Sequence, residues 1–319
     1  MKDSKNIAVV FPGQGSQRSG MGKDFYEQIP ICRETYEEAA DALGWDVSKM
    51  CFGEDERLNL TEYTQPCIVT TEIAMLRGLS KRYGFTSEYF GGHSLGEFTA
   101  LVAAGVMPIA ETLKIVQTRG KLMQEAVPVG VGGMAAVISE DIDIEMLTKI
   151  MDGLNADIAN INSTNQVVIS GELPAINETE KRITQNFPPE KKIRFIRLNV
   201  SAPFHSRLMK TIENRFADTL EKFGKNLNPQ NAHKVTSNFT GAFHSDDILG
   251  IREKLVNQIS NTVQWRKNMQ SLAEKVEEIY EIGPGRPLRD FFKTIGVTCQ
   301  SITGLAAAEK IFSGSVKLE

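Results

Sequence analysis

Cysteine is scarce in this sequence, and long apolar runs are missing. The four cysteines among 319 residues form no Cys-x-x-Cys pair and no metal-binding spacing, which argues against a disulfide framework and predicts reduced, mostly buried thiols. No apolar run approaches the ~20 residues that span a bilayer. The first residues lead into a short strand instead of a signal-peptide core, so we expect a cytoplasmic protein that binds no membrane.

An excess of basic residues is also missing. Lys and Arg number 36 against 40 Asp and Glu, which gives a net charge of −4. These totals imply no general nucleic-acid-binding face. The chain is 41% hydrophobic and long enough to bury a large core, in one large domain with an insertion or in two domains.

Strand and helix patterns alternate along the first part of the chain. Residues 7–11 form a continuous apolar run, typical of a parallel strand buried on both faces. We expect helices at 28–43, 67–83 and 108–126 and a short strand at 86–91. This alternation predicts an α/β fold with a mainly parallel sheet.

The middle of the chain changes character. We expect strands at 134–139, 158–162, 166–170 and 192–198, with helices at 143–151 and 174–186. This βαββαβ order predicts a ferredoxin-like small subdomain at 129–200. Residues 1–128 and 201–319 would form the large subdomain, with further helices at 206–223, 248–259 and 263–273 and strands at 234–237 and 278–282.

Residues 92–96, Gly-His-Ser-Leu-Gly, form a Gly-x-Ser-x-Gly motif between the expected strand and a helix-forming segment. This is the nucleophile turn of α/β-hydrolase-like proteins, whose glycines permit a cramped backbone and leave the serine exposed. Ser94 is thus a candidate nucleophile, and the N–H of Leu95, at a helix N-terminus, a candidate oxyanion donor. The alternative is a chance match in a glycine-rich loop.

A serine nucleophile needs a base, and the chain has only four histidines. His93 adjoins Ser94, but neighbours on a sharp turn usually point apart, so a packing or hydrogen-bonding role is expected. His233 and His244 lie in polar segments and are expected to be solvated. His205 lies where the small subdomain returns to the large one, and clefts between subdomains bind ligands. His205 is therefore the candidate base.

Together these motifs resemble the malonyl-CoA:acyl-carrier-protein transacylase family, the acyltransferases of fatty acid and polyketide synthesis. The resemblance extends over essentially the whole chain. The matching segments are residues 11–17, 63–66, 92–97, 119–123, 162–171, 203–206 and 281–285.

The resemblance implies a ping-pong acyl transfer in which Ser94 is the nucleophile and His205 the base. The backbone carbonyl of Gln258 would orient the imidazole, and the glutamine side chain need not contribute. Backbone N–H groups of Gln14 and Leu95 would form the oxyanion hole. A nucleotide site at the first glycine loop is disfavoured, because the loop lacks Gly-Lys-Ser/Thr and the Gly-x-Gly-x-x-Gly spacing.

The resemblance also assigns the substrate contacts. Arg119 would bind the free carboxylate of malonate beside Met123, an arginine that merely hydrolytic family members tend to lose. Phe204 would crowd an α-methyl branch, which favours malonyl over methylmalonyl by about 1–3 kcal/mol. The remaining expected substrate-binding residues are Gln65, Asn162 and His93.

The implied substrates are malonyl-CoA and the phosphopantetheine arm of an acidic acyl carrier protein. No metal or bound cofactor is implied, and we expect a monomer that serves carriers in trans. A basic docking face would include some of Lys181, Arg182, Lys191, Lys192, Arg194, Arg197, Arg207, Lys210, Arg286 and Arg289, although such charges are usually just solvated. Two alternatives remain: an acyl-thioester hydrolase of the same fold, and a non-catalytic carrier-binding scaffold.

Overall fold

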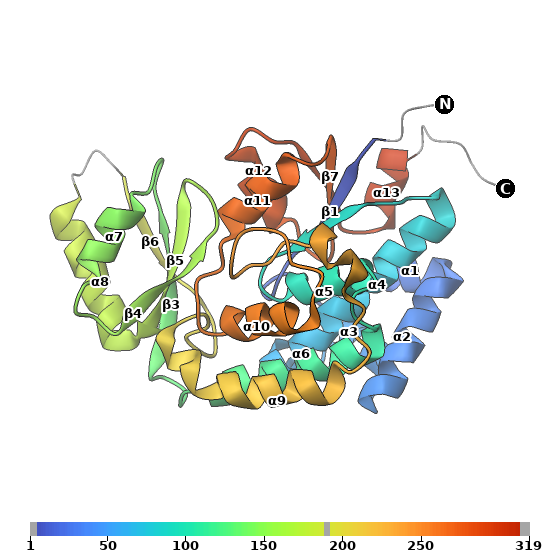
Figure 1. Ribbon diagram of the computed structural model, residues 1–319, viewed down its shortest axis with the longest axis horizontal. Helices are drawn as coiled ribbons and strands as arrows, with labels where there is room; N and C mark the ends of the chain where they lie inside the picture. The colour runs from blue at the N-terminus through green and yellow to red at the C-terminus, as the bar shows by residue number, and fades with distance from the viewer. Residues whose placement is uncertain (1–4, 188–191, 313–319) are drawn as a thin grey trace.

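Two separate sheets organise the fold in the computed structural model, which describes residues 5–187 and 192–312. The first contains β1 (Ile7–Phe11), β2 (Tyr89–Gly92), β7 (Glu278–Ile282) and β8 (Cys299–Ile302), in the order β2-β1-β7-β8. All neighbouring strands in it are parallel. It lies in the larger part of the molecule, on the right of Figure 1.

Helices cover both faces of the parallel sheet. Val9 and Phe11 of β1 belong to the main core, whereas Ala8 and Val10 belong to a second cluster with Trp265. A strand that is buried on both faces is a continuous apolar run, as residues 7–11 are. The helices of this part are α1 (Lys23–Gln28), α2 (Pro30–Leu43), α3 (Val47–Phe52), α4 (Thr61–Tyr83), α5 (Gly96–Ala103), α6 (Ile109–Glu125), α9 (Glu213–Phe223), α10 (Ile248–Gln258), α11 (Trp265–Ala273), α12 (Pro287–Lys293) and α13 (Leu305–Phe312).

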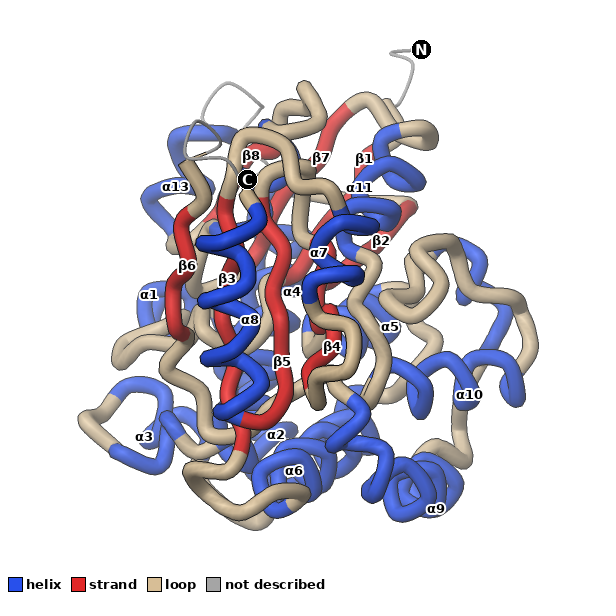
Figure 2. The backbone as a smooth tube through the Cα atoms, turned by 90° about the vertical axis from the view of Figure 1, so that its left-hand side faces the viewer, coloured by secondary structure: helices blue, strands red, loops and turns tan. Residues whose placement is uncertain are grey.

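The second sheet is antiparallel and has the strand order β4-β5-β3-β6. Its elements follow one another as β3 (Gly132–Ile138), α7 (Ile144–Ile150), β4 (Ala156–Ile161), β5 (Gln166–Glu172), α8 (Leu173–Asn186) and β6 (Arg194–Arg197). Figure 2 shows α7 and α8 side by side in front of this sheet. Ala135 and Val137 pack in the cluster beneath these helices, while Met134 and Ala136 join the main core. Successive side chains of a strand point to opposite faces of the sheet. The small sheet therefore packs against its own helices on one face and against the rest of the molecule on the other.

The predicted fold class is confirmed: a mainly parallel sheet with an inserted βαββαβ unit. The domain boundaries at 129 and 200 stay a prediction, with β3 to β6 lying between them.

One helix begins earlier than predicted. The segment 67–83 was expected to start after Pro66, yet α4 begins at Thr61 and includes this proline. Tertiary contacts hold the additional turn, because Thr61 N donates to Gln124 Oε1 at 3.0 Å and Thr64 Oγ1 donates to the Leu58 carbonyl at 2.6 Å. These contacts offset the backbone hydrogen bond that proline cannot make.

Two other predicted elements differ. Residues 206–223 form a 3₁₀ helix, Arg207–Ile212, followed by α9. The strand predicted at 234–237 is wrong, because Val235 and Thr236 make only isolated bridges, to Phe90 and Phe243. The chain leaves the edge of β2 there, and Asn238 then reaches the turn at Ser94.

Candidate active site

Ser94 lies on a tight turn between β2 and α5, as its motif predicts. Its φ of 52° is in the left-handed region, a strained conformation that is typical of nucleophile turns. Both flanking glycines are sterically required, because a Cβ on Gly92 would collide with the backbone of Gly96, and a Cβ on Gly96 would collide with the Phe11 carbonyl. The local sequence thus forces the serine out of the turn.

His205 contacts the nucleophile directly. Its Nε2 lies 2.7 Å from Ser94 Oγ, and its Nδ1 lies 2.8 Å from the Gln258 carbonyl oxygen. A carbonyl only accepts, so Nδ1 carries the proton and Nε2 is free to accept the serine proton. Burial, with a further contribution from the Arg119 cation, lowers the pKa of His205 to about 3. The imidazole is therefore neutral at physiological pH, the state that a base requires.

Arg119, from α6, is a buried cation beside the same serine. Its Nη2 donates to Ser94 Oγ at 3.1 Å and to Gln258 Oε1 at 2.9 Å, and its Nη1 donates to Gln65 Oε1 at 3.0 Å. Burial lowers its pKa to about 10, so the guanidinium stays charged at neutral pH. Within residues 5–187 and 192–312 it forms no ion pair, and its Nε has no hydrogen-bond partner. An unpaired buried cation favours binding of an anion.

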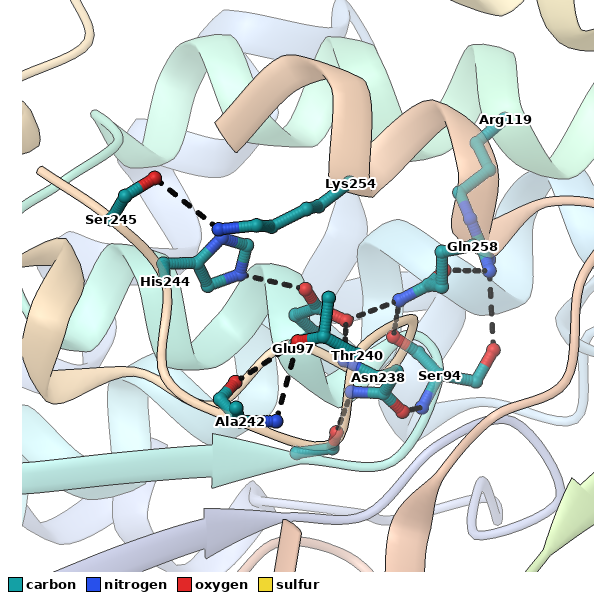
Figure 3. Close-up of polar contacts among 11 residues, drawn as sticks. Ser94, Glu97, Arg119, Asn238, Thr240, Ala242, His244, Ser245, Lys254 and Gln258 are labelled. Atoms are coloured by element: carbon teal, nitrogen blue, oxygen red, sulfur yellow. Dashed lines mark hydrogen bonds and ion pairs between the residues drawn. The ribbon is translucent and has the colours of Figure 1, made fainter. Parts of the chain in front are cut away.

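The side chain of Gln258 has a larger role than expected. This residue, at the end of α10, is completely buried. Besides orienting His205 through its carbonyl, it accepts from Arg119 and donates from Nε2 to the Ser94 carbonyl at 3.0 Å and to Glu97 Oε2 at 2.7 Å. The expectation of an incidental side chain is wrong. Figure 3 shows the amide lying between Glu97, Arg119 and the turn at Ser94.

The first glycine loop packs against the nucleophile turn. His93 N donates to the Phe11 carbonyl at 3.0 Å, and a Cβ on Gly13 would collide with the His93 carbonyl. The backbone N–H groups of Gln14 and Leu95 donate to no group of the described residues. Free N–H groups of this kind are what an oxyanion hole needs, and their role stays a prediction.

His93 connects the turn to the small sheet instead of contacting the serine hydroxyl. Its Nε2 lies 2.7 Å from Asn162 Oδ1, and Asn162 Nδ2 donates to Gln166 Oε1 at 2.8 Å. Burial lowers the pKa of His93, so this ring is also neutral. The hydrogen-bonding role expected for His93 is confirmed, and its predicted part in substrate binding, with Asn162, is left to experiment.

Known proteins place this arrangement in a family. The chain matches the model of the acyl transferase domain over residues 8–284. The chain belongs to the acyl transferase family. It is 36% identical over 303 residues to the malonyl CoA-acyl carrier protein transacylase of Bacillus subtilis (strain 168), which covers 93% of this chain and 92% of that protein.

Solved structures of acyl transferases have the same fold. The malonyl CoA-acyl carrier protein transacylase from Clostridium perfringens superimposes with a TM-score of 0.88 at 36% identity, covering 97% of this chain and 96% of the other. A malonyl-transacylase in complex with its type II PKS acyl-carrier protein superimposes with a TM-score of 0.86 at 33% identity, covering 97% and 99%. The resemblance inferred from the motifs is therefore confirmed.

Two further predicted residues of this acyl transferase are buried, one near Arg119 and one beside His205 in the sequence. Met123 follows Arg119 by one turn of α6 and is 2% exposed, and Phe204 immediately precedes His205 and is 9% exposed. Both belong to the main core. Their predicted roles in substrate selection remain predictions.

Sequence reasoning missed three residues of the acyl transferase site: Glu97, Asn238 and His244. All three are buried, and they form one hydrogen-bonded group beneath the turn. The expectation that His244 is solvated is wrong, whereas His233 is exposed as expected and pairs with Asp246. Glu97 could have been suspected, because an ionisable residue three positions after the nucleophile must enter the buried start of α5.

The described part of the acyl transferase has neither a metal-binding cluster nor a membrane-spanning helix. No group of three or more His, Cys, Asp or Glu side chains in it could hold a metal ion. None of its helices is long and apolar enough to cross a membrane.

Proposed function

We propose that the protein transfers a malonyl group from coenzyme A to the phosphopantetheine thiol of an acyl carrier protein. The observation that carries this proposal is the buried Arg119 guanidinium, which forms no ion pair with a carboxylate of the described residues and lies 3.1 Å from Ser94 Oγ. A malonyl ester on Ser94 has a free carboxylate a few bonds from that oxygen. The carboxylate would form, through a bidentate contact, the ion pair that the guanidinium lacks within the described residues.

The first half-reaction acylates the serine. His205 Nε2 takes the Ser94 hydroxyl proton while Oγ attacks the thioester carbonyl, and collapse of the tetrahedral intermediate breaks the C–S bond. The departing thiolate of coenzyme A takes the proton from Nε2. N–H donors of Leu95 and Gln14 would hold the oxyanion, each worth roughly 10²- to 10³-fold in rate.

The second half-reaction reverses these steps with a new thiol. The carrier thiol gives its proton to His205, its sulfur attacks the malonyl ester, and Ser94 Oγ leaves with the proton. Coenzyme A is a substrate in this scheme, and the proposal includes no metal or bound cofactor.

Most of the basic residues considered for carrier docking already form ion pairs within this chain. Lys191 lies outside the described residues, and six others form ion pairs with neighbouring acids, among them Arg197 with Glu180 and Arg207 with Asp157. Lys192, Arg194 and Arg286 are exposed and form no ion pair within the described ranges. We call these three the open basic set and propose that they meet the acidic carrier.

The expected monomer also remains part of the proposal. Light scattering of the purified protein tests this expectation, and a dimer mass would contradict it.

Intact-mass spectrometry tests the proposed function. Incubation with malonyl-CoA should add one malonyl group, and a holo carrier protein should then remove it. Ser94→Ala should show no adduct, and Arg119→Ala a much weaker one. Free malonate without carrier loading would support the hydrolase alternative, and the absence of any adduct with malonyl-CoA or acetyl-CoA would support the scaffold alternative.

A further inference from the structure

The structure assigns positioning roles to Glu97 and His244, an inference that rests on the function proposed above. Glu97 lies in the first turn of α5 and is completely buried. Its Oε2 accepts from Asn238 N at 2.9 Å and from Gln258 Nε2 at 2.7 Å. Its Oε1 accepts from His244 Nε2 at 2.8 Å. Figure 3 shows the carboxylate between these donors, which offset the cost of burying it.

Glu97 and the Ser94 carbonyl, both of which accept from Gln258 Nε2, together determine which way the Gln258 amide points. Because a carboxylate only accepts, the amide must turn its nitrogen to Glu97 and its oxygen to Arg119, 2.9 Å away. A flipped amide would place its NH₂ against the guanidinium and its oxygen against the carboxylate. The backbone of the same glutamine orients His205. Through Gln258, Glu97 therefore acts on both Arg119, the cation proposed to bind the substrate, and His205, the base.

Asn238, whose backbone N–H donates to Glu97, also holds the nucleophile turn. The side chain of Asn238 accepts from Ser94 N at 2.8 Å and donates from Nδ2 to the Gly92 carbonyl at 2.7 Å. These two bonds clamp the turn on both sides of His93. Since Ser94 is in a strained left-handed conformation, the surrounding contacts must maintain it. Asn238 makes these contacts, and Glu97 holds Asn238 in place by accepting from its backbone N–H.

His244 holds the remaining oxygen of Glu97. Both side chains are 0% exposed. The imidazole uses Nε2 for this contact, and its Nδ1 has no hydrogen-bond partner among the described residues. Without the Nε2 donor, a buried carboxylate oxygen would be unsatisfied, and the carboxylate would rotate away from Gln258 and Asn238 to find another donor. A shift of about 1 Å in a catalytic group costs on the order of 10²-fold in rate.

Two amide substitutions separate this role from packing. His244→Gln places an amide nitrogen near the position of Nε2, whereas His244→Asn places it near Nδ1, which makes no bond. The probe is an aryl sulfonyl fluoride, which modifies a serine activated by its base and needs no acyl substrate. We expect His244→Gln to react at Ser94 within about threefold of the unmodified protein and His244→Asn to react at least about 10-fold more slowly.

Malonyl-CoA provides the second measurement. Glu97→Gln is expected to lower the kcat of carrier malonylation by about 10²-fold, with a smaller change in KM. His233→Asn, at an exposed histidine, is the matched control. It should change neither the rate of sulfonyl fluoride modification nor the kcat of carrier malonylation. Melting temperatures of all variants are measured in parallel.

The inference is overturned if His244→Gln and His244→Asn react alike, or if their rates fall only in proportion to their melting temperatures. In that case the imidazole merely packs. Absence of malonyl transfer by the unmodified protein would instead overturn the proposed function, while the sulfonyl fluoride comparison would still decide the positioning roles.

Discussion

Arg119→Met should abolish the preference for malonyl-CoA over acetyl-CoA. The substitution removes the guanidinium 3.1 Å from Ser94 Oγ. It leaves the His205 contacts of 2.7 and 2.8 Å in place, because a backbone carbonyl orients the ring. Methionine retains a long flexible stem that fills the buried space. The chemical step should therefore survive while recognition of the carboxylate is lost.

The magnitude follows from the burial of Arg119, which is 1% exposed. Loss of one partner of a buried charged pair costs about 2–5 kcal/mol. At about 1.4 kcal/mol per tenfold, kcat/KM for malonyl-CoA should fall roughly 30- to 4000-fold. Acetyl-CoA has no carboxylate to lose, so its kcat/KM should stay within about threefold or rise.

Stability should change little in this variant. Burial lowers the pKa of Arg119 to about 10, which corresponds to about 3 kcal/mol that methionine avoids. The amide oxygens of Gln65 and Gln258 each lose a donor, at about 1–3 kcal/mol each. These effects roughly cancel.

The assay is the initial rate of carrier acylation with each thioester. Arg119→Lys serves as a second variant and should recover only part of the rate, because an ammonium cannot make the bidentate contact. The reasoning is refuted if the ratio of the two kcat/KM values stays unchanged, or if both fall together at an unchanged melting temperature.

Three more outcomes concern the base, the turn and the carrier surface. Burial lowers the pKa of His205 to about 3, so acylation should lose half of its activity only near pH 3, whereas a solvated imidazole would lose it near 6.5. A pH profile of kcat/KM that falls near 6.5 would contradict this. Gly96→Ala should lower the free energy of urea unfolding by more than about 4 kcal/mol, because the new Cβ would collide with the Phe11 backbone. Gly105→Ala is the control: its φ is 73° and the space around it is open, so the loss should be about 1 kcal/mol. Charge reversal of the open basic set should raise KM for the carrier but not for malonyl-CoA, and an unchanged carrier KM would exclude these three residues from carrier docking.

The fold and the nucleophile turn could be predicted because short-range patterns encode them. The apolar run of β1, the apolar run of β3 and the glycines around Ser94 each reflect sterics or burial within a few residues. The sequence pattern predicted a wrong helix boundary where contacts between separate segments determine the start of the helix. Pro66 predicted a helix start, but contacts of Thr61 and Thr64 with segments outside the helix extend α4 back past it.

The sequence by itself determined the α/β fold, the strand–turn–helix around Ser94 and, through family resemblance, the pairing of Ser94 with His205. Only the tertiary structure decided that Arg119 forms no ion pair within the described part of the chain and that Gln258 uses its side chain. It also decided that His244 turns inward while its neighbours Ser245 and Asp246 are exposed. The physical reason is that local polarity does not reveal a side chain's direction, whereas burial and charge balance depend on groups more than a hundred residues apart in the chain.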